Sequence, residues 1–68
     1  MQLSARNQFK GHVLWVHKGQ TTGHVKIDIG AGNIVASSIT DEAIDEVALQ
    51  PGDEVVAVVK ASDVMVAK

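Results

Sequence analysis

Apolar and polar residues alternate over several short stretches of this chain, and alternation of period two is the pattern of strands in a sheet. The clearest case is residues 24–29, where Val25 and Ile27 lie on one parity and His24 and Lys26 on the other. This stretch predicts a strand with one face in solvent. Four further strands are predicted by similar patterns, at residues 8–17, 34–39, 54–60 and 63–67.

Two of these strands are apolar on both parities. In residues 8–17, Val13, Trp15 and His17 share one parity while further apolar residues occupy the other, so we expect burial on much of both faces. Residues 54–60 show the same property. One face of that strand is expected to meet the core, and the other to meet a second subunit.

The period changes after Thr40, which predicts a helix over residues 41–48. Thr40 supplies a capping hydroxyl, and acidic residues follow in the first turn, where the helix dipole favours them. Turns are expected at residues 18–20, 30–33 and 50–53, which carry the glycines and the proline that tight turns need. Five strands with a short helix between the third and the fourth predict a mainly β fold, a small OB-like barrel.

The short length and the composition of the chain limit how stable such a barrel is as a single subunit. With 68 residues it is expected to be a single domain, residues 1–68, whose core contributes only a few kcal/mol net, and the absence of cysteine removes disulfides as a source of stability. Oligomerisation is the remaining means of stabilisation. The net charge of −2 and the two aromatic residues argue against binding to nucleic acid or to an anionic membrane.

No stretch of the sequence has the features of a secretory signal, and no apolar run approaches the roughly twenty residues of a membrane span. We therefore expect a soluble, cytoplasmic protein. A catalytic function is not expected, because no serine or cysteine nucleophile with an oriented base is evident and the acidic residues after Thr40 fit the solvated side of a helix.

Two short clusters combine a cation with a hydroxyl group. Near the start, Ser4 and Arg6 are separated by one alanine, and near the end Lys60 and Ser62 are separated in the same way. Guanidinium, ammonium and hydroxyl groups all donate hydrogen bonds, and two positive charges match a dianion. The pattern indicates a site for a tetrahedral oxyanion.

These residues carry a resemblance to a known family. The run Ser4-Ala5-Arg6-Asn7-Gln8 with Gly11 and Val13, the turn at residues 30–33, and the run of residues 60–65 resemble the molbindins, also called Mop-type or molybdenum-pterin-binding proteins. The resemblance covers essentially the whole chain. It implies an OB-like homo-hexamer, a trimer of dimers, that binds molybdate or tungstate at subunit interfaces for storage and homeostasis in the cytoplasm.

The resemblance also implies which residues bind the oxyanion. Ser4 and Arg6 of one subunit are expected to meet Lys60 and Ser62 of another, and the full expected set is Ser4, Ala5, Arg6, Thr40, Lys60, Ala61 and Ser62. Molbindins are described as having a second anion site formed largely by backbone. Our prediction for it is the turn at residues 18–22, with Gly19, Gln20 and Thr22, although an ordinary hairpin turn explains the same residues.

Two alternatives stay open from the sequence. The first is a transition-metal site formed by the three histidines, His12, His17 and His24. Their spacing matches no familiar zinc pattern, and His12 and His17 fall on opposite parities of one strand. No cation site is therefore expected. The second alternative is an oligomeric interaction module that senses oxyanion or delivers it to a protein partner.

Overall fold

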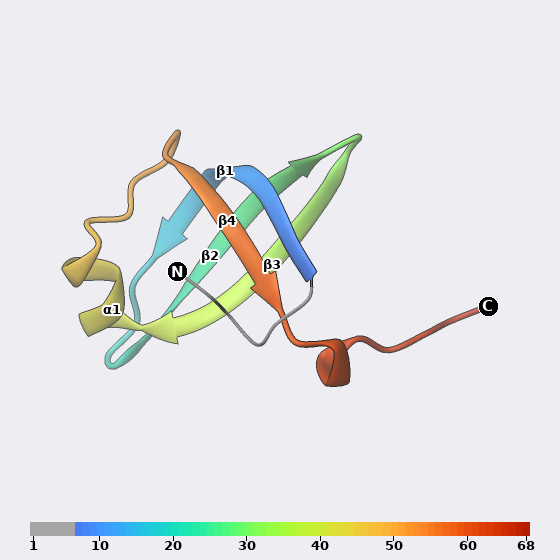
Figure 1. Cartoon of the computed structure of the whole chain (residues 1–68). Helices are drawn as coiled ribbons and strands as arrows, with labels where there is room; N and C mark the ends of the chain where they lie inside the picture. Colours follow the sequence, from blue (N-terminus) through green and yellow to red (C-terminus); the bar gives the residue numbers. More distant parts are fainter. Residues whose placement is uncertain (1–6) are drawn as a thin grey trace.

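A computed structural model describes residues 7–68, and over this range it contains four antiparallel strands and one short α-helix (Figure 1). In chain order the elements are β1 (Asn7–His17), β2 (Thr22–Gly30), β3 (Asn33–Thr40), α1 (Asp41–Glu46), β4 (Glu54–Val59) and the 3-10 helix η1 (Ala61–Asp63). The strands form one curled sheet in the order β3-β2-β1-β4. The predicted mainly β fold with one short helix is confirmed.

Strand β1 is the central element of this sheet. Its first half pairs with β4, from Asn7 opposite Val59 to His12 opposite Glu54, and its second half pairs with β2, from His12 to His17. A strand of 11 residues that pairs with two neighbours in succession makes the sheet curl into a half-barrel. The curl leaves β3 and β4 as the outer strands.

The hairpin that joins β2 to β3 follows the sequence prediction closely. Val25 and Ile27 are buried on the inner face of β2, as the alternation predicted. Gly30 is paired with Asn33, and the two residues between them, Ala31 and Gly32, have φ values of 53° and 79°. Positive φ at both central positions is typical of two-residue hairpin turns, because their twist matches that of the strands.

Strand β1 departs from regular alternation at Leu14. The pairing with β2 shifts between Val13 and Trp15, which is a β-bulge with Leu14 as the extra residue. Val13 is 2% exposed and faces the core, whereas Trp15 and His17 are exposed on the outer face. The prediction that these three residues share one face is therefore wrong, because the bulge reverses inside and outside along β1.

Helix α1 begins where the sequence predicted and ends earlier than predicted. The Thr40 hydroxyl accepts a hydrogen bond from the amide of Ala43 at 3.1 Å, which caps the first turn. The helix stops at Glu46 instead of residue 48, because Ala48 adopts a φ of 49° that no α-helix continues. The Ile44 side chain, 3% exposed, packs into the core from this helix.

The predicted fifth strand at residues 63–67 is wrong. Ala61–Asp63 form η1, and residues 64–68 leave the sheet as an extended segment without strand pairing (Figure 1). Met65 and Val66 are 94% and 92% exposed. Their alternation fits a strand, but strand formation also needs a partner edge, and within the described chain this segment contacts none.

The core is small and lies inside the curl. Its buried members are Val13, Val25, Ile27, Ile44 and Ala57.

Among residues 7–68, no helix is long and apolar enough to cross a membrane. A hollow of about 280 Å³ remains on the inner face, bordered by β2, β3 and β4.

Truncation of the helix side chain in the core should cost much of the stability. We expect Ile44→Ala to lower the free energy of unfolding by about 2–5 kcal/mol, because it leaves a cavity among few buried residues. Val47→Ala is the matched control, since Val47 follows the same helix and is 66% exposed. Urea unfolding at one fixed protein concentration gives both values, and a similar loss in both variants would contradict the assignment of Ile44 to the core.

The cap of α1 offers a second test. We expect Thr40→Ala to lower the free energy of unfolding by about 1 kcal/mol, because the amide of Ala43 loses its acceptor. Thr40→Ser keeps a hydroxyl oxygen at this position and should retain most of the stability. Equal stability of the alanine and wild-type proteins in urea unfolding would show that the cap contributes nothing.

Candidate functional site

The first cluster of the expected oxyanion site, Ser4, Ala5 and Arg6, lies outside the described residues. The structure nevertheless fixes where the following strand begins. Asn7, the first described residue, is paired with Val59 at the end of β4. The strand that follows Arg6 in sequence and the strand that precedes Lys60 therefore meet at one end of the sheet.

The second cluster surrounds η1. Lys60 is the N-cap of this 3-10 helix, and Lys60, Ala61 and Ser62 are all exposed. The carbonyl oxygen of Lys60 accepts a hydrogen bond from the amide of Asp63 at 2.9 Å, and the carbonyl oxygen of Ala61 accepts one from Val64. Within residues 7–68 the Lys60 ammonium forms no ion pair, so its charge remains available to a ligand.

Thr40 lies apart from this cluster in a single subunit. It ends β3 and caps α1, and Figure 1 shows α1 and η1 at opposite sides of the sheet. Its oxygen accepts the Ala43 amide at 3.1 Å, which leaves the hydroxyl proton free to donate. The predicted capping role is confirmed. A ligand contact with both Thr40 and Lys60 requires residues from more than one copy of the chain.

The turn proposed for a second anion site is held by its own hydrogen bonds. The amide of Gly19 donates to the carbonyl oxygen of Thr22 at 3.1 Å, and the Lys18 ammonium forms an ion pair with Asp45. A Cβ on Gly19 would lie 2.5 Å from that same carbonyl oxygen, so the turn itself requires glycine there. The exposed Gln20 keeps its side-chain donors. The second site at Gly19, Gln20 and Thr22 stays a prediction.

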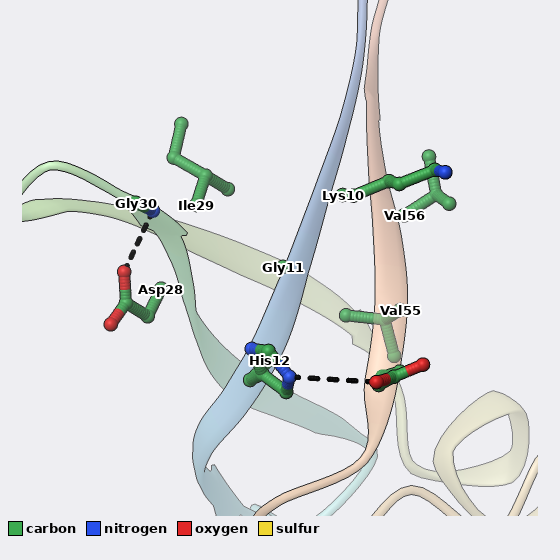
Figure 2. Close-up of a pocket in the computed structure, with 9 residues that line it drawn as sticks. Lys10, Gly11, His12, Asp28, Ile29, Gly30, Val55 and Val56 are labelled. Carbon is green, nitrogen blue, oxygen red and sulfur yellow. Dashed lines mark hydrogen bonds and ion pairs between the residues drawn. The ribbon is translucent and has the colours of Figure 1, made fainter.

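A hollow among the described residues does not contain the expected oxyanion residues. It has a volume of about 720 Å³ and is formed by β1, the end of β2 and the start of β4 (Figure 2). His12 on β1 lies 3.8 Å from its cross-strand neighbour Glu54 on β4, and Asp28 accepts a hydrogen bond from the amide of Gly30 (Figure 2). Two carboxylates outweigh the single ammonium of Lys10, so this surface does not suit a dianion.

A group of polar and aromatic side chains on the outer face includes two of the histidines considered in the sequence, and its arrangement was not predicted. Trp15 and His17 stack with ring centroids 5.5 Å apart, and the Lys26 ammonium lies 5.5 Å from the Trp15 ring centroid. His24 is hydrogen-bonded to Ser38. The signal that could have revealed this group is the position of the Leu14 bulge, which simple alternation does not show.

Comparisons with known proteins agree with the resemblance seen in the sequence. Residues 3–66 match the model of the TOBE domain family. The chain is 44% identical over 66 residues to a probable molybdenum-pterin-binding protein of Haemophilus influenzae, covering 97% of this chain and 96% of that one.

Two solved structures are similar over nearly the whole chain. A molybdate-binding protein from Sporomusa ovata superposes with a TM-score of 0.93 at 32% identity and covers 100% of both chains. The cytoplasmic molybdate-binding protein ModG, in a form with molybdate bound, superposes with a TM-score of 0.91 at 37% identity, over 96% of this chain and 46% of ModG. The chain described here therefore belongs to the TOBE domain family, among the molybdenum-pterin-binding proteins of Mop type.

Proposed function

We propose that this protein binds molybdate or tungstate at its subunit interfaces and stores it in the cytoplasm, with residues 1–68 acting as one oxyanion-binding domain. The observation that carries the proposal is the near-complete structural match to proteins described as molybdate-binding, one of them with molybdate bound. ModG is also described as cytoplasmic. The activity proposed is binding without catalysis.

The chemistry of the two clusters supports an oxyanion ligand. A buried dianion needs its charge offset and its oxygens hydrogen-bonded, since an unpaired buried charge costs several kcal/mol. Arg6 and Lys60 supply two positive charges, and Ser4 and Ser62 supply hydroxyl donors. The Lys60 ammonium has no competing carboxylate partner in the described part of the chain, which supports its assignment to the ligand.

The shape of the single subunit supports assembly. Val64, Met65 and Val66 expose apolar side chains on a segment that has left its own sheet. The outer strands β3 and β4 both border the hollow on the inner face. In the strand register Thr40 lies at the His17 end of β1, whereas Lys60 follows Val59 at the Asn7 end, so one chain does not bring the two residues together. We propose the homo-hexamer, a trimer of dimers, as the arrangement in which a second copy covers these surfaces.

Selectivity is proposed to come from the size of the cavity. Molybdate and sulfate carry the same charge, so charge balance alone does not separate them. Metal–oxygen bonds are longer than sulfur–oxygen bonds, and a cavity fitted to molybdate leaves sulfate short of contacts with the donors. A wall rich in donors also disfavours protonated phosphate, which presents a donor of its own.

A second candidate function is an oligomeric module that delivers or senses oxyanion through a protein partner. The exposed apolar segment after η1 favours it, because a partner protein is an alternative cover for that segment. The two functions differ in stoichiometry. Storage by the two proposed kinds of site, the second at Gly19, Gln20 and Thr22, predicts more than one anion per pair of subunits at saturation.

The cation clusters lead to a direct test by calorimetry. We expect Arg6→Ala and Lys60→Ala each to weaken molybdate binding by about 1.5–3 kcal/mol, roughly tenfold to a hundredfold in Kd, because each removes a charged hydrogen-bond donor. Lys26→Ala is the matched control, since Lys26 lies over Trp15 on the outer face. Equal losses in all three variants would reduce the site to a general effect of charge.

Mixing the two variants tests whether the clusters come from different subunits. When Arg6→Ala and Lys60→Ala subunits assemble together, a site built from two chains is intact wherever Lys60 of the first variant meets Arg6 of the second. Strong binding should then return at a fraction of the interfaces. No recovery in the mixed oligomer would place both clusters of each site in one chain.

Native mass spectrometry tests assembly and ligand together. We expect a hexamer that gains several molybdate ions and gains no sulfate at equal concentration, because the cavity is fitted to the larger ion. We also expect Met65→Asp to reduce the hexamer, because it places a charge on the exposed apolar segment. A monomer that binds no molybdate would overturn both the assembly and the function.

A further inference from the structure

Two histidines stand directly opposite each other on the outer face of the sheet. His17 on β1 is paired with His24 on β2, and both are exposed. The bulge at Leu14 produces this arrangement, because it shifts the alternation so that Trp15 and His17 lie on the outer face while Val16 packs against the core. Neither residue is among those expected to bind the oxyanion, and the pair lies at the base of the turn at residues 18–22.

Both imidazole rings are held by neighbours. The Nδ1 atom of His24 lies 3.0 Å from the Ser38 hydroxyl oxygen, and the His17 ring stacks on Trp15 with an angle of 8° between the planes. When Nδ1–H of His24 donates to that hydroxyl, Nε2 carries the lone pair that a metal needs. A hydrogen bond from the second ring nitrogen is the usual support of a metal-binding histidine.

The spacing of the pair suits chelation. Residues directly opposite in an antiparallel sheet have Cβ atoms about 4.5–5.5 Å apart. Metal–nitrogen bonds of about 2.0–2.1 Å place two neighbouring ligands about 3 Å apart, a separation within reach of two imidazole side chains that start from such Cβ positions. We propose that His17 and His24 together bind a late first-row divalent ion, with Cu²⁺ preferred according to the Irving–Williams order.

The surroundings define how open this site is. Among residues 7–68, no third histidine, cysteine or carboxylate completes a group of metal ligands, so the other coordination positions are open to water. His12 lies elsewhere on β1, opposite Asp28 and 3.8 Å from Glu54. The positive charge of Lys26 disfavours a bound cation nearby. Its ammonium lies over the Trp15 ring, and in the register Lys26 is opposite Trp15, next to the histidine pair.

Fluorescence of the single tryptophan gives a direct readout of this site. Trp15 stacks on His17, and bound Cu²⁺ quenches a neighbouring indole, so titration of the full protein with Cu²⁺ should give saturable quenching at one ion per subunit. We expect His17→Gln and His24→Gln each to raise the quenching midpoint at least tenfold. Ser38→Ala should raise it about tenfold, because His24 loses its supporting contact.

His12→Gln is the matched control, since it removes a histidine from the same strand without touching the pair, and its midpoint should equal that of the wild type. Electron paramagnetic resonance of the Cu²⁺ complex should show two nitrogen ligands in the wild type and one in each single variant of the pair. Equal shifts in the His12 and His17 variants, or a spectrum without imidazole nitrogens, would overturn the proposal. Circular dichroism confirms that each variant is folded, and unchanged molybdate binding by His17→Gln separates this site from the oxyanion site.

Discussion

The incomplete closure of the sheet is the constraint on which the rest of this structure depends. Four strands curl into a half-barrel, and the outer strands β3 and β4 each keep one edge without a strand partner in the described chain. The core inside the curl has five buried residues and draws one of them, Ile44, from α1. A subunit with so small a core has a low free energy of unfolding, and binding of a partner to its exposed surfaces raises that free energy directly.

The parts of the fold that the sequence predicted well are those determined by near neighbours. The alternation of β2, the turn at Ala31 and Gly32, and the Thr40 cap each depend on contacts within a few residues. The bulge in β1 was not predictable in this way. An extra residue at Leu14 leaves the composition of the strand unchanged and shows only in its pairing with β2.

The same limit applies to the residues after η1 and to the candidate site. Val64 and Val66 alternate as residues of a strand do, but a strand also needs a partner edge, and the described chain supplies none to this segment. For the oxyanion residues, the sequence predicted a role for Lys60 and Ser62 from their chemistry, and the structure shows both residues exposed after the end of β4. The register places Thr40 at the opposite end of β1 from the end of β4, and this is a property of the fold that no local pattern contains.

The exposure of Met65 has a chemical consequence. Its side chain is 94% exposed, so the thioether sulfur is open to peroxide and similar oxidants. Oxidation to the sulfoxide makes a flexible apolar side chain polar, and here it would do so within the segment whose apolar surface most needs cover. In the proposed oligomer, where a second copy covers this segment, oxidation of Met65 in the free subunit would weaken its association.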